Sequence, residues 1–251
     1  MERKTDMSHF IFYDYVSAIL KEAFESQQEV LEAVAQEMTD VIATGHLIYV
    51  FGAGHAGILA EELFYRAGGL VPINPIFAPG LTTTTRPATL ETELERLSGY
   101  AQLLLDASKI TPADLLIIHS NSGRNTVAIE MGELARERGI KVVAITSIKH
   151  SESVTSRHPR GLKLMDIADY VIDNWGVVGD AVVELKGLDQ RVGASSTIIG
   201  AALVNALVVE VAQKLLKRGL EPPIFCSANV DNSQANNQRW LAHYGPRLLY
   251  L

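Results

Sequence analysis

Near its middle the chain carries the sequence Leu115-Leu116-Ile117-Ile118-His119-Ser120-Asn121-Ser122-Gly123-Arg124-Asn125-Thr126. The first part is a continuous apolar run, which is typical of a strand buried on both faces of a parallel sheet. The second part is a row of small and polar residues that leads into a helical pattern at 125–138. Hydroxyl and amide groups at the positive end of a helix can bind a dianionic phosphate. The stretch therefore predicts a strand, an anion-binding loop and a helix, although an N-cap and ordinary turn residues would account for part of the loop.

Apolar runs and helical patterns alternate on both sides of this unit, which predicts an α/β fold with a parallel sheet covered on both faces. Pro72 and Pro75 indicate that the second strand lies at an edge. Residues 1–45 have helical spacing and are expected to form a helical extension, followed by an α/β core at 46–218 and a tail at 219–251, all in one domain. Strands are expected at 47–51, 70–77, 115–118, 141–146 and 170–172, and helices at 55–67, 90–108, 125–138 and 194–217.

The composition excludes several classes of protein. The 251 residues are 47% hydrophobic with a net charge of −7, and no basic face is visible, so no nucleic-acid partner is expected. The most apolar stretch, 197–212, is shorter than the roughly 20 residues of a membrane span, so a buried helix and no membrane partner are expected. The single Cys226 and the absence of a signal-peptide pattern at Met1–Asp6 fit a cytoplasmic protein.

A second loop, Gly52-Ala53-Gly54-His55-Ala56-Gly57, matches the pattern G-x-G-x-x-G between a strand and a helix. A dinucleotide site would also require an acidic residue about 20 positions further on. Residues 73–80 contain no acid, which argues against a dinucleotide. The glycines can still bring the helix close to a ligand, and no cofactor is predicted.

Together, Gly52 to His55, the Ser-x-Ser-Gly of Ser120 to Gly123 and the small residues before the last long helix resemble the SIS (sugar isomerase) domain. The resemblance is strongest to the UPF0309 group and also covers phosphoheptose isomerase and N-acetylmuramic acid 6-phosphate etherase. It implies a flavodoxin-like three-layer αβα sandwich with five parallel strands and a sugar-phosphate ligand. Relatives often have Ser or Thr at the position of Asn125. By the resemblance, the substrate-binding residues are Gly54, Ser120, Asn121, Ser122, Gly123, Asn125, Ser195 and Ser196.

The resemblance also implies catalytic residues. Glu62 matches the base of phosphoheptose isomerase, and His55 would lie near the sugar, where an imidazole could act as acid or base. That isomerase uses a His in its last helix, but this chain has Asn205 in that region, which leaves two alternatives open. One is an isomerase or lyase for a phosphorylated sugar, and the other is a non-catalytic phosphosugar sensor. No metal is predicted, and apolar helix faces favour a homodimer or a higher homo-oligomer.

Overall fold

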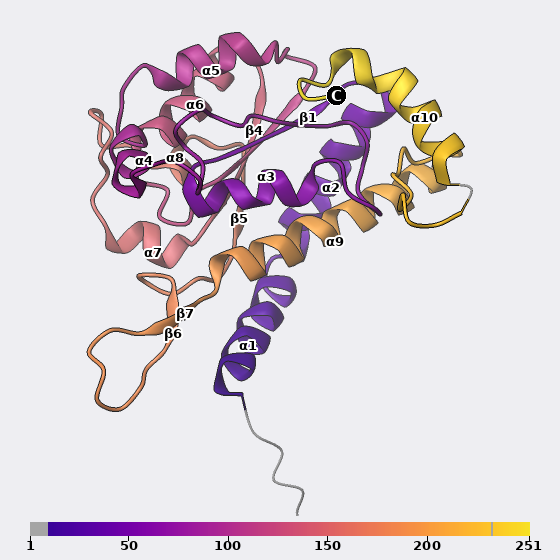
Figure 1. The fold of residues 1–251 in the computed structure, drawn as a ribbon. Coiled ribbons are helices and arrows are strands. Elements are labelled where there is room, and N and C mark those ends of the chain that lie inside the picture. Colours follow the sequence, from indigo (N-terminus) through magenta and orange to yellow (C-terminus); the bar gives the residue numbers. More distant parts are fainter. Residues whose placement is uncertain (1–9, 232) are drawn as a thin grey trace, which may run out of the picture.

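The computed structural model describes residues 10–231 and 233–251, so Met1–Asp6, on which the signal-peptide argument rests, lies outside the described residues. A five-stranded parallel sheet has the order β2-β1-β3-β4-β5 (Figure 1). This confirms the predicted sheet, and the order is that of flavodoxin-like folds. The strands are β1 (Ile48–Gly52), β2 (Ile73–Pro75), β3 (Leu115–His119), β4 (Lys141–Thr146) and β5 (Tyr170–Asp173).

Alternate residues of each strand face two separate apolar layers. Ile48 and Val50 of β1 pack, with Leu115 and Ile117 of β3, against the helices of one face. Tyr49 and Phe51, with Leu116 and Ile118, pack against the other face. The first face is covered by α1 (Ile11–Glu25), α2 (Gln28–Ala43), α3 (Ile58–Leu63) and α9 (Ser196–Lys217). The second is covered by α5 (Tyr100–Ser108), α6 (Thr126–Glu137) and α8 (Leu164–Ile167), with Phe225, Tyr244 and Leu248 from the tail.

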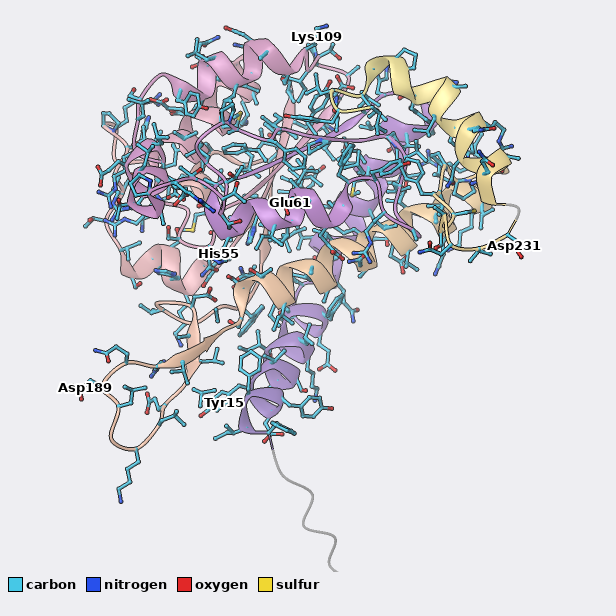
Figure 2. The ribbon with its side chains drawn as sticks, viewed as in Figure 1. Tyr15, His55, Glu61, Lys109, Asp189 and Asp231 are labelled. Carbon is cyan, nitrogen blue, oxygen red and sulfur yellow. The ribbon has the colours of Figure 1, made fainter. Side chains whose placement is uncertain are left out.

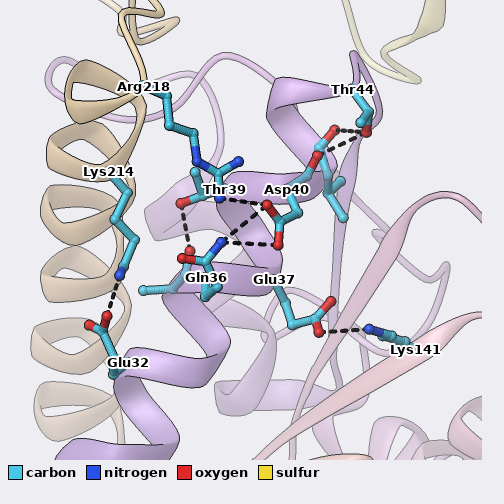
Figure 3. A network of polar contacts seen from close by, with 11 residues as sticks. Glu32, Gln36, Glu37, Thr39, Asp40, Thr44, Lys141, Lys214 and Arg218 are labelled. Atoms are coloured by element: carbon cyan, nitrogen blue, oxygen red, sulfur yellow. Dashed lines mark hydrogen bonds and ion pairs between the residues drawn. The ribbon is translucent and has the colours of Figure 1, made fainter.

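Polar contacts attach α2 to its neighbours at the surface of the first face (Figure 3). Arg218 Nη2 lies 2.6 Å from Asp40 Oδ1, and Lys141 Nζ lies 2.6 Å from Glu37 Oε1. Burial tends to raise the pKa of Asp40, but hydrogen bonds from Gln36 and Arg218 outweigh it and lower that pKa. These exposed pairs contribute little energy each, so the apolar layer beneath them is what holds α2 in place.

Helix α9 is the one helix in residues 10–231 and 233–251 that is long and apolar enough to cross a membrane. The mean hydropathy of its most apolar window is 1.6, and 44% of that window is buried in the protein. Ile199, Leu203 and Leu207 lie in the core layer that α9 forms with α2 and α3. A core helix has these same properties, as the sequence predicted for 197–212.

Several predicted elements differ from the structure. The expected helix at 90–108 is two helices, α4 (Ala88–Leu94) and α5, because Gly99 adopts a φ of 83° between them. The expected helix at 55–67 is a 3₁₀ turn, η1 (Gly54–Gly57), followed by the short α3. The strand expected at 70–77 is limited to β2, at the edge that its prolines predicted.

Several further elements lie outside the ranges predicted for strands and helices. An antiparallel hairpin of β6 (Ala181–Val183) and β7 (Val192–Ala194) projects beside α1 (Figure 1). The helix α7 (Ile148–Ser153) begins at a Ser147 cap, and the tail contains α10 (Ser233–Tyr244) followed by a 3₁₀ turn, η2 (Gly245–Arg247).

Residues of the tail cover the outer side of β2. Asn74, fully buried in β2, donates from Nδ2 to the carbonyl of Arg247 at 3.2 Å and accepts from the N–H of Leu249 at 2.9 Å. Leu70 forms an antiparallel bridge with Ile224 just before β2. The edge strand β2, buried at all three residues, is therefore fastened to segments that are distant in sequence.

Candidate functional site

A cavity of about 230 Å³ lies at the carboxyl ends of β1 and β3. The strand order reverses between these two strands, and ligands of open α/β sheets bind at such a point. The cavity therefore occupies the position that the fold favours for a ligand. Its lining includes Ala53, His55 and Ala56 after β1, His119 at the end of β3, Ser120, Asn121, Ser122 and Asn125 after it, and Glu95, His150, Asp180 and Ser196 from other segments.

The serine loop, Ser120 to Gly123, presents free hydroxyls from a well-supported backbone. The hydroxyls of Ser120 and Ser122 have no hydrogen-bond partner in the described part of the chain. Asn121 between them is held in place, since its Oδ1 accepts from Asn174 Nδ2 at 2.9 Å and its carbonyl accepts from Ser147 N at 3.0 Å. The loop thus offers two oriented hydroxyls next to the N-terminus of α6, a twelve-residue helix.

Gly123 allows the loop to turn. Its φ is +58°, a conformation that L side chains rarely adopt. A Cβ there would lie 3.2 Å from both Ser151 Oγ and Thr146 Oγ1. Gly123 therefore shapes the loop, while its contact with a ligand stays a prediction.

Asn125 connects two charged groups at the cavity wall. Its Nδ2 donates to Glu95 Oε2, and its Oδ1 accepts from Arg157 Nη1 at 2.7 Å. Asn125 is the N-cap residue of α6, but its side chain makes no hydrogen bond to the backbone N–H groups of the first turn. In this structure Asn125 positions Glu95, and its predicted contact with phosphate stays a prediction.

Glu95 is the most perturbed acid at the cavity. Burial raises its pKa, and the neighbouring Glu91 carboxyl raises it further, to about 8, against the opposing effects of Arg157 and Asn125. Glu91 lies one helical turn earlier and its Oε1 is buried without a partner among the described residues. Two close carboxyls do not both ionise readily, so Glu95 is protonated at neutral pH and can give up its proton slightly above it.

Two histidines also line the cavity. His119 is 1% exposed, and burial lowers its pKa despite the opposing effects of Ala56 and Asp180. Burial likewise lowers the pKa of His150. Both side chains therefore favour the neutral imidazole at neutral pH.

Asp180 supports the start of α9. Its Oδ1 accepts from Ser195 N at 3.1 Å and Ser196 N at 2.8 Å, and its Oδ2 accepts from Ser196 Oγ at 2.7 Å. Ser195 is completely buried and its hydroxyl also faces Asp180, whereas Ser196 lines the cavity. The carboxylate replaces the acceptors that the first N–H groups of a helix lack.

Replacing Asp180 with Ala is expected to lower the free energy of unfolding by about 1–2 kcal/mol, the usual loss when a helix cap is removed. Urea denaturation measures the change. Asp180→Asn is the matched control, because its amide oxygen can still accept from both backbone groups. Equal midpoints for the alanine variant and the wild type would contradict the capping role.

The other predicted residues lie at different distances from the cavity. His55 is exposed at the rim, at the entry to α3, and Glu61 lies further along that helix (Figure 2). Gly54 is adjacent, and a Cβ on it would lie 2.8 Å from Glu91 Oε1. Glu62 is not among the residues that line the cavity. Its carboxylate instead pairs with Arg66 and accepts a hydrogen bond from Asn205 Nδ2 at 2.8 Å. Its role as the base stays a prediction.

Glu95, His150 and Asp180 were not singled out from the sequence. Glu95 lies inside a segment with helical spacing, and nothing local shows that it meets Asn125, thirty positions away. No group of three or more His, Cys, Asp or Glu side chains suited to a metal occurs within residues 10–231 and 233–251.

Sequence comparison finds a family match over more than half of the chain. The profile of the SIS domain matches residues 11–147. A UPF0309 protein of Shouchella clausii is 41% identical over 240 residues, which are 96% of this chain and 98% of the relative. A second, from Oceanobacillus iheyensis, is 40% identical over the same shares of the two chains.

Solved structures share the fold at low sequence identity. A phosphoheptose isomerase from Francisella tularensis has a TM-score of 0.53 and 15% identity, over 80% of this chain and 95% of that one. The NanR protein of Vibrio vulnificus, solved in complex with ManNAc-6P, has a TM-score of 0.50 and 18% identity, over 95% and 69% of the two chains. At these identities the likeness extends to the fold alone.

Proposed function

The chain belongs to the UPF0309 group of the SIS-domain family, and from this we propose that it binds a phosphorylated sugar in the cavity at β1 and β3 and catalyses proton transfer on it. The observation that carries the proposal is one cavity that joins the free hydroxyls of Ser120 and Ser122 to the half-buried acid Glu95. Similar folds include a phosphoheptose isomerase and a protein in complex with ManNAc-6P, which supports this class of ligand.

The phosphate would lie against the serine loop. Its charge meets the N-terminal end of α6 and two hydroxyl donors, which is sufficient for an anion although no Lys or Arg belongs to the described lining. Glu95 is protonated near neutral pH, so it adds little repulsion. The sugar would then extend toward His119 and His55.

Glu95 would supply the acid and base. Aldose–ketose isomerisation and elimination both move a proton to or from carbon, and a group with a pKa near the working pH transfers protons in both directions. With a pKa of about 8, the Glu95 carboxyl gives a proton to carbon and its carboxylate takes one back. We assign this role to Glu95 because it lines the cavity, where Glu62 does not.

The double variant Ser120→Ala/Ser122→Ala is expected to weaken sugar-phosphate binding by about 100-fold or more, because two hydrogen bonds to a charged group are lost and each is worth roughly 1.5–3 kcal/mol. Thermal-shift titration with fructose 6-phosphate, glucosamine 6-phosphate and N-acetylglucosamine 6-phosphate measures it. Ser153→Ala, an exposed hydroxyl that donates to the His150 carbonyl at 2.8 Å, is the control. If no sugar phosphate raises the melting temperature of the wild type, the proposed ligand class is wrong.

The second candidate function is a phosphosugar sensor without turnover. It is favoured by Asn205, which lies in the part of α9 where the resemblance to phosphoheptose isomerase implies a His and whose Nδ2 donates to Glu62 away from the cavity. Incubation with the same sugar phosphates in D₂O separates the two functions. Deuterium appearing at a carbon of the sugar supports the enzyme, whereas binding without exchange supports the sensor.

The homodimer predicted from the sequence is also part of the proposal. Phe10 and Tyr13 at the start of α1 are 76% and 70% exposed, and Ile198 near the start of α9 is 42% exposed. Large exposed apolar side chains on two adjoining helices suit a surface that a second copy covers.

A further inference from the structure

His119 is a buried histidine whose tautomer is fixed by its surroundings. It is the last residue of β3, pairs in register with Gly52 of β1 and is 1% exposed. Its Nδ1 lies 3.0 Å from the carbonyl oxygen of Ala56 in η1. A carbonyl only accepts, so Nδ1 carries the proton and Nε2 presents a lone pair.

No donor in the described part of the protein forms a hydrogen bond with that lone pair. Nε2 is buried and has no hydrogen-bond partner among the described residues, although His119 is part of the cavity lining. A buried acceptor without a partner costs roughly 1–3 kcal/mol. Such an atom in the wall of a ligand cavity is satisfied when a ligand donates to it.

We propose that His119 is a catalytic residue of this cavity, whose Nε2 takes the proton from a hydroxyl of the bound sugar phosphate. This inference rests on the proposed function. It pairs a nitrogen base at the end of β3 with the Glu95 carboxyl, which lines the same cavity from the end of α4.

The step can be written for an enediol formed from the sugar. The O–H bond breaks, an Nε2–H bond forms, and the electron pair left on oxygen becomes the new C=O bond. The C=C pair takes the Glu95 proton and becomes a C–H bond. In the reverse direction the Glu95 carboxylate removes the proton from carbon while the imidazolium protonates the carbonyl oxygen.

The environments of the two groups fit the step from the enediol to the carbonyl. The reverse step, which forms the enediol from the bound sugar, uses the Glu95 carboxylate and the protonated His119. Burial lowers the pKa of His119, which leaves it a neutral base, while burial and Glu91 raise the pKa of Glu95, which leaves it an acid. When the pKa values of two titratable groups in one site are shifted in opposite directions, the two groups are candidates for the base and the acid. The ring of His55 at the rim is exposed and makes no hydrogen bond among the described residues, so it is not fixed in the same way.

The variant His119→Asn tests the proposal, because its Nδ2 can still donate to the Ala56 carbonyl while the Nε2 lone pair is removed. With fructose 6-phosphate and glucosamine 6-phosphate as probes, we expect binding to change by less than about threefold and deuterium exchange in D₂O to fall by roughly 100-fold or more. His158→Asn is the control, since His158 is also buried but pairs with Glu133 at 3.2 Å and does not line the cavity. Urea denaturation checks that both variants fold.

A second measurement does not depend on turnover. In uniformly ¹⁵N-labelled protein, the Nε2 resonance of His119 is expected to be that of an unprotonated nitrogen and to shift when a probe binds. If a probe moves the Ser122 amide but not Nε2, or if His119→Asn exchanges deuterium at the wild-type rate, the inference is wrong and the proposed function stands. If no probe moves either signal, both are wrong.

Discussion

Glu95→Gln is expected to slow proton exchange on a bound sugar phosphate by roughly 10²–10⁴-fold, the usual effect of losing a general acid or base. The amide has the shape of the carboxyl and can keep the contact with Asn125, so binding should change little. Deuterium exchange followed by NMR measures the rate, and thermal shift measures binding. Exchange at the wild-type rate would contradict the role of Glu95 and return attention to Glu62.

The control for this variant is Glu93→Gln on the same helix. Glu93 has a 70% exposed side chain and pairs with Arg96 at 3.1 Å, so it carries charge near the site without reaching the cavity lining. Removing it should leave exchange within about threefold of the wild type, because exposed ion pairs contribute little.

The stability of the same variant, Glu95→Gln, relative to the wild type is expected to depend on pH. The ordinary pKa of the glutamate is 4.5, and burial with Glu91 raises the folded value to about 8. Between these values the folded state holds a proton that the unfolded chain releases, so the wild-type free energy of unfolding falls as pH rises from about 4.5 to 8. The glutamine side chain of the variant does not titrate. The melting temperature of Glu95→Gln relative to wild type should therefore rise over this window, by at least about 2 °C, and stay level above it.

Gly52→Ala is expected to lower the free energy of unfolding by about 3 kcal/mol, the upper end of the usual range for an overfilled site. A Cβ at Gly52 would lie 2.5 Å from both the carbonyl carbon and the oxygen of Ala56, and 2.8 Å from the Gly57 nitrogen. These are backbone atoms, so the clash cannot be relieved by turning a side chain. Any shift of η1 would also disturb the Ala56 carbonyl that holds His119.

Gly245→Ala is the matched control, because nothing lies within 4 Å of a Cβ there. Its stability should stay within about 0.5 kcal/mol of the wild type, as for most surface substitutions. Urea denaturation compares the two variants. Similar midpoints for Gly52→Ala and the wild type would show that the β1–η1 turn can move without cost.

The parallel sheet could be predicted because its strands have distinctive local patterns. Runs such as residues 115–118 are apolar at every position, which only a strand covered on both faces requires. The serine loop was found for the same reason, since its polar residues follow a strand and precede a helix. Elements with weaker patterns were missed: α10 is mostly polar, and β7 is exposed at all three residues.

The acid of the site could not be found in this way. Glu95 matters because α4 ends beside the loop after β3, and that meeting depends on the break at Gly99 and on the packing of α6. Its altered pKa is a property of burial and of Glu91, neither of which a sequence pattern shows. The resemblance favoured Glu62 instead, whose carboxylate is engaged with Arg66 and Asn205.

The tail segments that contact β2 and the residues before it also affect how readily the protein aggregates. An edge strand presents unpaired N–H and C=O groups that can recruit a strand from another molecule and start aggregation. Here the tail forms a bridge with Leu70 just before β2 through Ile224 and binds the Asn74 side chain through Arg247 and Leu249, and β2 is buried at all three residues. Because the tail covers β2, we expect it to hinder β-pairing between molecules, an effect that is separate from any reaction in the cavity.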